Sequence, residues 1–401
     1  MKSLFTFIIC LIALTVTGQN KYNFDTTKTE ELRVRDGLPN FFKKLKEGKN
    51  VTIGYIGGSI TNGGLWRAKS LEWFKSEYPK ATISQVNAAI GGTGPDYGAC
   101  RIQNHLLQHN PDMVFIEYRV NNGGVYQGRA FEGLISQIWK HNPTTEICIV
   151  YTIAQWMKND IQKGKQTSAG IWMEPVANHY GITSIEFGLE VMKQLKAGKL
   201  VFKKGDSPAD GKIIFSKDGV HPIEAGHDIY RDVLVRSLKS IENYGVVGVN
   251  KIPSPTRENV FSNAKMVPVT EAKFSTNWES VDLSGEVDIN DDLTDKNNGA
   301  KTLYNKAFQT SKVGASFTFK WEGFLLGLTT LLDKKGAIQI EVTTDGGAPK
   351  IVDLKSRKGS PRPKYFFLNE LKDGSHITTI KVVKLEPEKV FQVGQFLVVD
   401  N

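Results

Sequence analysis

Short apolar segments alternate with helix-like segments over about the first 245 residues, and this alternation limits the fold more than any other feature of the chain. The strands are expected at residues 51–56, 81–88, 113–118, 146–153 and 182–186, and the helices at 38–46, 65–77, 96–108, 131–140, 174–180, 189–200 and 224–241. Nearly unbroken apolar strands are typical of a parallel sheet that helices cover on both faces. We therefore predict an α/β domain built as a three-layer sandwich around a mostly parallel sheet.

Polar and glycine-rich segments follow the first three of these strands. Ser59 comes after the first strand, Gly92 after the second and Asn121 after the third. Asp218 and His221 lie much later, immediately before the helix expected at 224–241. Because right-handed crossovers bring the carboxyl ends of parallel strands to one edge of a sheet, we expect these side chains to meet in one crevice.

Together these residue types suit nucleophilic catalysis. A serine hydroxyl is a weak nucleophile until an imidazole takes its proton, and the imidazole needs a carboxylate to fix its tautomer. Ser59 would be the nucleophile, His221 the base and Asp218 the orienting acid. The backbone N–H groups of Ser59 and Gly92, with the Asn121 amide, would stabilise a developing oxyanion.

Each segment taken alone is more often structural, since Asp-Gly usually marks a turn. Their order is more specific: Gly57-Gly58-Ser59, Gly91-Gly92, Asn121, then Asp218-Gly219-Val220-His221 resemble the SGNH, or GDSL-type, hydrolase family. That resemblance implies a flavodoxin-like sandwich with a Ser-His-Asp esterase site. The family often has Asp where this chain has Asn122, and the adjacent glycines leave Gly91 or Gly92 open as the oxyanion donor.

Other residues near the expected crevice are weaker candidates for substrate contacts. Asn122 follows Asn121 directly and is one such candidate. Glu117 ends a strand near Asn121, and the alternative is a structural, hydrogen-bonded carboxylate. Trp156 and Trp172 bound a polar excursion after another strand, which either faces the substrate or packs on the domain. The sequence has no pattern that predicts a metal site, a nucleotide-binding loop or a cofactor.

The first residues predict export. Lys2 precedes an apolar run at residues 4–16, which is too short for a comfortable membrane span, and small residues lead up to Gln19. We expect a signal peptide at 1–18 and a periplasmic or extracellular protein. The formal charge of +9 is spread along the chain, so no nucleic-acid partner is expected. Cys100 and Cys148 are expected to be buried thiols, although a bridge between them stays open.

The character of the chain changes near residue 249. Residues 19–248 form the predicted hydrolase domain, the Pro-containing segment 249–264 a linker, and residues 265–401 a jelly-roll-like β-sandwich with alternating strands. The sandwich is expected either to bind carbohydrate or to serve a structural role. If it is independent, a chain that ends near residue 250 should still hydrolyse a small soluble ester.

These features favour an exported serine esterase that acts on a carbohydrate ester, above all an O-acetyl group on a polysaccharide or oligosaccharide. Export and the appended sandwich favour a glycan over a lipid, and no long apolar lid is present. The alternatives are a non-catalytic glycan-binding protein and a lipase or thioesterase of the same fold. The sequence leaves the glycan, the acyl group and the oligomeric state open.

Overall fold

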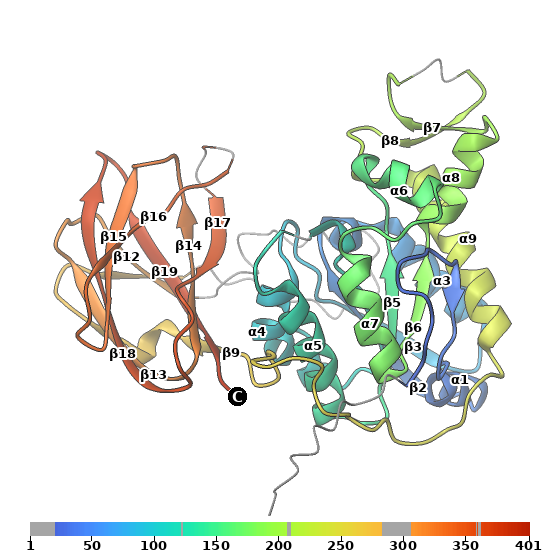
Figure 1. Cartoon of the computed structure of the whole chain (residues 1–401), viewed down its shortest axis with the longest axis horizontal. Helices are drawn as coiled ribbons and strands as arrows, with labels where there is room; N and C mark the ends of the chain where they lie inside the picture. Colours follow the sequence, from blue (N-terminus) through green and yellow to red (C-terminus); the bar gives the residue numbers. More distant parts are fainter. Residues whose placement is uncertain (1–20, 122, 207–209, 283–305, 358, 360–361) are drawn as a thin grey trace, which may run out of the picture.

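The computed structural model describes the chain except residues 1–20, 122, 207–209, 283–305, 358 and 360–361. The expected signal peptide and Asn122 therefore lie outside the described residues. Two lobes lie side by side, an α/β lobe and an all-β lobe (Figure 1). No helix in the described part of the chain is both long and apolar enough to cross a membrane.

The α/β lobe is built on a six-stranded sheet in the order β1-β6-β5-β4-β2-β3. All neighbouring strands are parallel except β1, which pairs antiparallel with β6. The strands are β1 (Leu32–Arg33), β2 (Asn50–Gly57), β3 (Thr82–Asn87), β4 (Met113–Glu117), β5 (Glu146–Tyr151) and β6 (Thr183–Glu186). A separate parallel pair is formed by β7 (Leu200–Lys203) and β8 (Ile213–Ser216).

Helices cover both faces of this sheet. They are α1 (Pro39–Lys46), α2 (Ser59–Asn62), α3 (Leu65–Glu77), α4 (Pro95–His105), α5 (Gln127–His141), α6 (Lys158–Gln162), α7 (Gly170–Tyr180), α8 (Gly188–Lys196) and α9 (Glu224–Ile241). Four short 3-10 turns are η1 (Leu107–His109), η2 (Arg119–Asn121), η3 (Gln155–Met157) and η4 (Val269–Glu271). Alternate residues of β4 enter opposite cores: Val114 packs with α4, α5 and α7, whereas Phe115 packs with α1, α3, α8 and α9. The predicted three-layer sandwich is confirmed.

The all-β lobe is a sandwich of two antiparallel sheets, with strand orders β10-β13-β18-β15-β16 and β11-β12-β19-β14-β17. An additional strand, β9, pairs with β19. The bounds are β9 (Lys265–Pro268), β10 (Lys273–Phe274), β11 (Glu279–Asp282), β12 (Lys306–Thr310), β13 (Ser316–Gly323), β14 (Leu325–Leu332), β15 (Ile338–Thr344), β16 (Lys350–Asp353), β17 (Arg362–Phe367), β18 (Gly374–Leu385) and β19 (Phe391–Val399). The expected C-terminal sandwich is confirmed.

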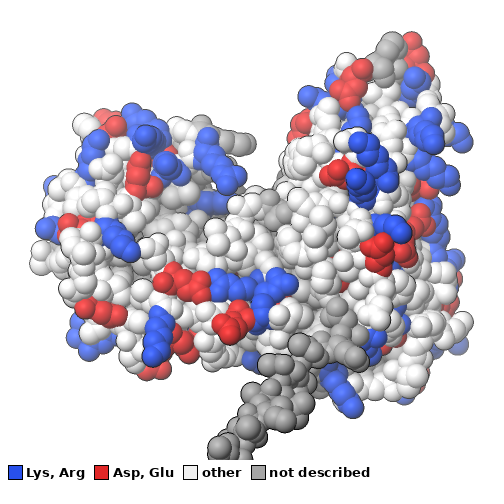
Figure 2. All heavy atoms as spheres, viewed as in Figure 1, with Lys and Arg blue, Asp and Glu red and all other residues white. Residues whose placement is uncertain are grey.

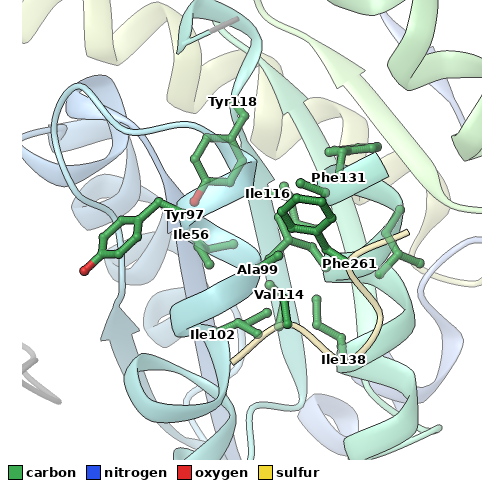
Figure 3. Close-up of a cluster of buried hydrophobic side chains, with 14 of the residues drawn as sticks. Ile56, Tyr97, Ala99, Ile102, Val114, Ile116, Tyr118, Phe131, Ile138 and Phe261 are labelled. Atoms are coloured by element: carbon green, nitrogen blue, oxygen red, sulfur yellow. The ribbon is translucent and has the colours of Figure 1, made fainter. Parts of the chain in front are cut away.

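The two lobes share a hydrophobic core. Along β14, Leu326 faces the interior of the sandwich, while its neighbour Leu325 joins the core formed with α4 and α5. Both faces of this strand are therefore buried, which explains its unbroken apolar sequence. Phe261, in the predicted linker, is completely buried between the lobes, and Figure 3 shows its ring near Phe131 and Ile116. The sandwich is thus not packed independently of the first lobe.

Candidate active site

Ser59 lies at the carboxyl end of β2, where the strand turns sharply into α2. The two preceding glycines are required by space. A Cβ at Gly57 would lie 2.4 Å from the Glu117 carbonyl oxygen, and a Cβ at Gly58 would lie 1.8 Å from Oδ1 of Asn121. Since Ser59 is the first residue of α2, its N–H group has no carbonyl partner within the helix. The turn therefore presents both the hydroxyl and the N–H group of Ser59.

A continuous chain of hydrogen bonds joins the three residues that the sequence singled out. Ser59 Oγ lies 2.8 Å from Nε2 of His221, and His221 Nδ1 lies 2.7 Å from Oδ2 of Asp218. The imidazole is about half exposed, with 49% of its side-chain surface accessible. A residue at position 59 thus comes into contact with one at position 221 through folding alone.

The loop before α9 holds the carboxylate of Asp218 in place. Its Oδ1 accepts hydrogen bonds from the backbone N–H groups of Val220 and His221, both at 2.9 Å, and from the Ser216 hydroxyl at 3.0 Å. Partial burial alone would raise the pKa of Asp218, but the hydrogen bonds from His221, Val220 and Ser216 outweigh it and hold that pKa below its usual range. The carboxylate is therefore ionised and correctly aimed at the imidazole.

Asn121 and the two glycines lie around Ser59. Asn121 ends the η2 turn, which is anchored by the buried Arg119 through a 2.7 Å hydrogen bond to the Thr152 carbonyl and an ion pair with Glu186. A Cβ on Gly91 would lie 3.4 Å from Cβ of Ser59, so that glycine packs beside the serine. Gly92 has a φ of +72°, a conformation that favours glycine, and it lines the same cleft as Ser59.

Two of the weaker candidates lie elsewhere. Glu117 is 1% exposed and accepts hydrogen bonds from the hydroxyls of Thr61, at 3.0 Å, and Thr152, at 2.7 Å. Burial raises its pKa, and it connects β4 to α2 rather than facing the cleft. Trp172 packs edge-on against Phe131, with ring centroids 5.5 Å apart, and does not line the cleft either. For both residues the structure agrees with the structural alternative.

Trp156, by contrast, borders the cleft. It is 62% exposed and lies in η3, within the excursion expected after β5. The adjacent Gln155 N–H donates a 2.8 Å hydrogen bond to the carbonyl of Gly219. Through this bond the η3 turn contacts the loop that carries Asp218 and His221, so Trp156 is positioned at the edge of the hydrogen-bonded triad.

The second lobe also reaches this cleft, which no sequence pattern predicted. The cleft has a volume of about 750 Å³, and the second lobe contributes Leu332, Lys355, Arg357 and residues 364–367 to its lining. Tyr365, in β17, donates a 2.7 Å hydrogen bond to Oδ1 of Asp96, and its hydroxyl accepts a 3.1 Å bond from Gly94 N–H.

These contacts tie β17 to the segment that carries Gly92. The Tyr365 ring stacks on Tyr97, with centroids 4.7 Å apart, and the Lys364 ammonium donates to the Gly92 carbonyl. Burial raises the pKa of Asp96, and the hydroxyl of Tyr365 together with the charge of Lys364 opposes that rise. The pair Lys364-Tyr365 lies in a β-rich segment with no motif around it, so the sequence alone could not predict that it contacts the Gly92 segment.

The described residues contain no cluster of three or more His, Cys, Asp or Glu side chains that could hold a metal ion. Cys100 and Cys148 are both buried and are not joined in a disulfide. Burial raises the pKa of the Cys148 thiol, which makes it a poor nucleophile.

No family model matches the chain, and no curated protein matches it. Among solved structures, a two-domain esterase active on acetylated mannans, co-crystallised with mannopentaose, is similar with a TM-score of 0.73 and 20% identity, over 90% of this chain and 93% of that chain. A second structure of a two-domain esterase active on acetylated mannans gives a TM-score of 0.73 and 20% identity, over 90% of this chain and 94% of that chain. The chain therefore shares the two-domain fold of these structures, in agreement with the α/β domain and appended β-sandwich expected above.

Proposed function

We propose that the protein is an exported serine esterase that removes an acyl group, above all an O-acetyl group, from a polysaccharide or oligosaccharide. The observation that carries the proposal is the hydrogen-bonded chain Ser59–His221–Asp218, with distances of 2.8 and 2.7 Å, in an open cleft. The similarity to an esterase active on acetylated mannans supports a glycan ester as the substrate class. The apolar N-terminal run at residues 4–16 supports export.

In the proposed reaction, His221 Nε2 takes the proton of Ser59 as Oγ attacks the ester carbonyl carbon. The resulting oxyanion accepts hydrogen bonds from the N–H groups of Ser59 and Gly92 and from the Asn121 amide. Asp218 keeps the proton on Nδ1 and stabilises the imidazolium. The imidazolium then protonates the leaving sugar oxygen, which leaves an acyl group on Ser59. Water, deprotonated by the same imidazole, releases the acid and restores the serine.

The open geometry fits a polymeric substrate. His221 and Asp218 are about half exposed, and the cleft is bordered by Trp156 on one lobe and by β17 on the other. An acyl group on a sugar ring can reach Ser59 while the flanking sugars stay in the groove. Aromatic side chains such as Trp156 suit the apolar faces of sugar rings.

The experiment compares wild-type protein with Ser59→Ala on a chromogenic acetyl ester and on acetylated polysaccharides, with acetate release as the readout. The variant should lose about 10³-fold or more of kcat while its melting temperature is unchanged. Ser240→Ala, on the outward part of α9, is the matched control and should keep full activity. Wild-type-like hydrolysis by Ser59→Ala, or no hydrolysis by the wild-type protein on any ester, would reject the proposal; glycan binding in the latter case would favour a non-catalytic binding protein.

A further inference from the structure

The wall that the second lobe contributes to the cleft is strongly basic. Lys355, Arg357 and Lys364 all line the space that contains Ser59 and His221. Among the described lining residues, Asp96 carries the only carboxylate, and it is buried and hydrogen-bonded to Tyr365. Figure 2 shows Lys and Arg side chains on the rim of the β-sandwich lobe that faces the notch between the lobes.

Two of these cations project from a firmly held backbone. Leu354, just before Lys355, is buried, and its N–H group donates a 3.0 Å hydrogen bond to the Ile338 carbonyl. Ser356 N–H donates to the Asp333 carbonyl at 2.5 Å. The side chains of Lys355 and Arg357 are exposed on either side of Ser356, and neither forms an ion pair with another residue in the described part of the chain. The third cation, Lys364, is bonded to the Gly92 carbonyl.

Lys355 and Arg357, which have no acidic partner among the described residues, favour anions in this groove. Carboxylate and sulfate groups form charge-assisted hydrogen bonds with Lys and Arg that are about twice as strong as bonds to neutral hydroxyl groups, and a guanidinium can hold a carboxylate through two parallel bonds. A groove lined by one sign of charge also attracts a polyanion before contact. A neutral glycan would gain neither effect.

We propose that Lys355, Arg357 and Lys364, here called the cationic rim, bind the anionic groups of the acylated glycan, so that the preferred substrate carries uronate carboxylates or sulfate esters. This inference rests on the proposed esterase function and narrows its substrate class. The anionic group would contact the sandwich residues of the cleft, while the ester bond lies against Ser59 in the same cleft.

The test measures kcat/KM of the full-length protein on acetylated oligogalacturonate, an acetylated sulfated galactan and acetylated mannan. The readout is the ratio of the value for each anionic substrate to that for mannan. Lys355→Glu/Arg357→Glu should lower this ratio about fivefold or more, since each exposed ion pair is worth up to about fivefold. Added salt should lower the wild-type ratio and leave that of the variant nearly flat.

The matched control is Lys320→Glu/Lys381→Glu, which makes the same change in net charge at exposed positions of β13 and β18 outside this cleft. An unchanged ratio in the rim variant would overturn the proposal, because the rim would then not select for anionic substrates. An equal loss in the control would also overturn it, because net charge rather than the rim would then be responsible. A loss with oligogalacturonate alone assigns the rim to carboxylates, and a loss with the sulfated galactan alone assigns it to sulfates.

Binding separates this proposal from the esterase proposal. Calorimetry compares unacylated oligogalacturonate and sulfated galactan with mannopentaose on the wild-type protein and on the rim variant. If the wild-type protein hydrolyses no ester, the esterase proposal fails, yet weaker binding of an anionic oligosaccharide by the rim variant still supports the rim. Equal binding by both proteins, whether or not esters are hydrolysed, rejects it.

Discussion

Removing one hydroxyl group, by Tyr365→Phe, tests whether the second lobe positions the catalytic machinery. The hydroxyl donates to Asp96 Oδ1 at 2.7 Å and accepts from Gly94 N–H at 3.1 Å, and both partners lie in the segment that follows Gly92. The substitution keeps the stack on Tyr97 but leaves a buried carboxylate with one donor fewer. Leaving a buried polar group without one of its hydrogen-bond partners costs about 1–3 kcal/mol.

The activity should fall by more than this loss of stability explains. Gly92 and Gly94 are two positions apart in the sequence. If Gly94 loses its hydrogen bond to the Tyr365 hydroxyl, the segment can shift and displace the N–H group of Gly92, the proposed oxyanion donor. Misplacement of a catalytic group by about 1 Å can cost about a hundredfold. We expect kcat on a small chromogenic acetyl ester to fall about ten- to a hundredfold, with the melting temperature lower by several degrees. A small ester is chosen because it does not need the cationic rim.

Tyr180→Phe is the matched control for this experiment. The Tyr180 hydroxyl donates a 3.0 Å hydrogen bond to Glu132, so the substitution removes the same kind of tyrosine–carboxylate bond outside the cleft. It should lower the melting temperature to a similar extent and leave kcat unchanged. If Tyr365→Phe retains wild-type kcat, or if both variants lose the same activity, the positioning role of Tyr365 is refuted.

Four further predictions concern the fold and the site. A chain that ends near residue 250 should aggregate rather than stay active on small esters, because the core around Phe261 and Leu325 would be exposed; a soluble, active truncated protein, judged by size-exclusion chromatography and small-ester assay, would contradict this. Gly58→Ala should lower kcat about a hundredfold, because the new Cβ would displace the Asn121 amide; unchanged kcat would argue against that contact. Glu174→Gln should cost about 3–5 kcal/mol in urea unfolding at neutral pH, because Arg33 and Arg35 lose their buried partner; a cost under about 1 kcal/mol would contradict it. With Asp218 kept ionised, kcat/KM should fall on acidification with the slope of a single proton, and a two-proton slope would count against the assignment.

The pH dependence of the Glu174 cluster follows from its pKa. Burial alone would raise the pKa of Glu174, but Arg35 and Arg33 outweigh it and lower the pKa in the folded protein. The stabilisation is therefore present above the unfolded-state pKa and is lost as the pH falls through the folded-state value. The difference in stability between wild type and Glu174→Gln should accordingly shrink on acidification.

Local sequence patterns determined the first lobe closely. The helices α3 (Leu65–Glu77) and α9 (Glu224–Ile241) have the bounds that their periodicity predicts, and the apolar runs fall on β2, β4 and β5. The positions of Ser59, Asn121 and His221 near one another also follow from the sequence, because each lies at a strand end or before a helix of a parallel sheet. Helices, strands and the turns between them depend mainly on residues a few positions apart, so a single sequence is enough to predict them.

Contacts between distant segments were decided only by the tertiary structure. Glu117 ends β4, close in sequence to Asn121, and Trp172 lies in α7. Their final partners depend on segments from elsewhere in the chain: Thr61 and Thr152 donate hydrogen bonds to Glu117, and Trp172 packs on Phe131. The strand that contains Leu325 departs from the alternation expected for the sandwich, because its second face is buried only when the two lobes are packed together.

The contribution of the sandwich to the cleft was likewise decided by contacts between distant segments. The sequence Lys364-Tyr365 resembles that of any exposed strand. Its role in the cleft follows from its contacts with Gly92, Gly94 and Asp96, which lie about 270 positions earlier in the chain. Sequence periodicity encodes which face of an element is apolar, but it does not encode the partner that covers that face. The docking of two apolar faces therefore decides which polar groups of the second lobe border Ser59, and this is a property of the assembled chain.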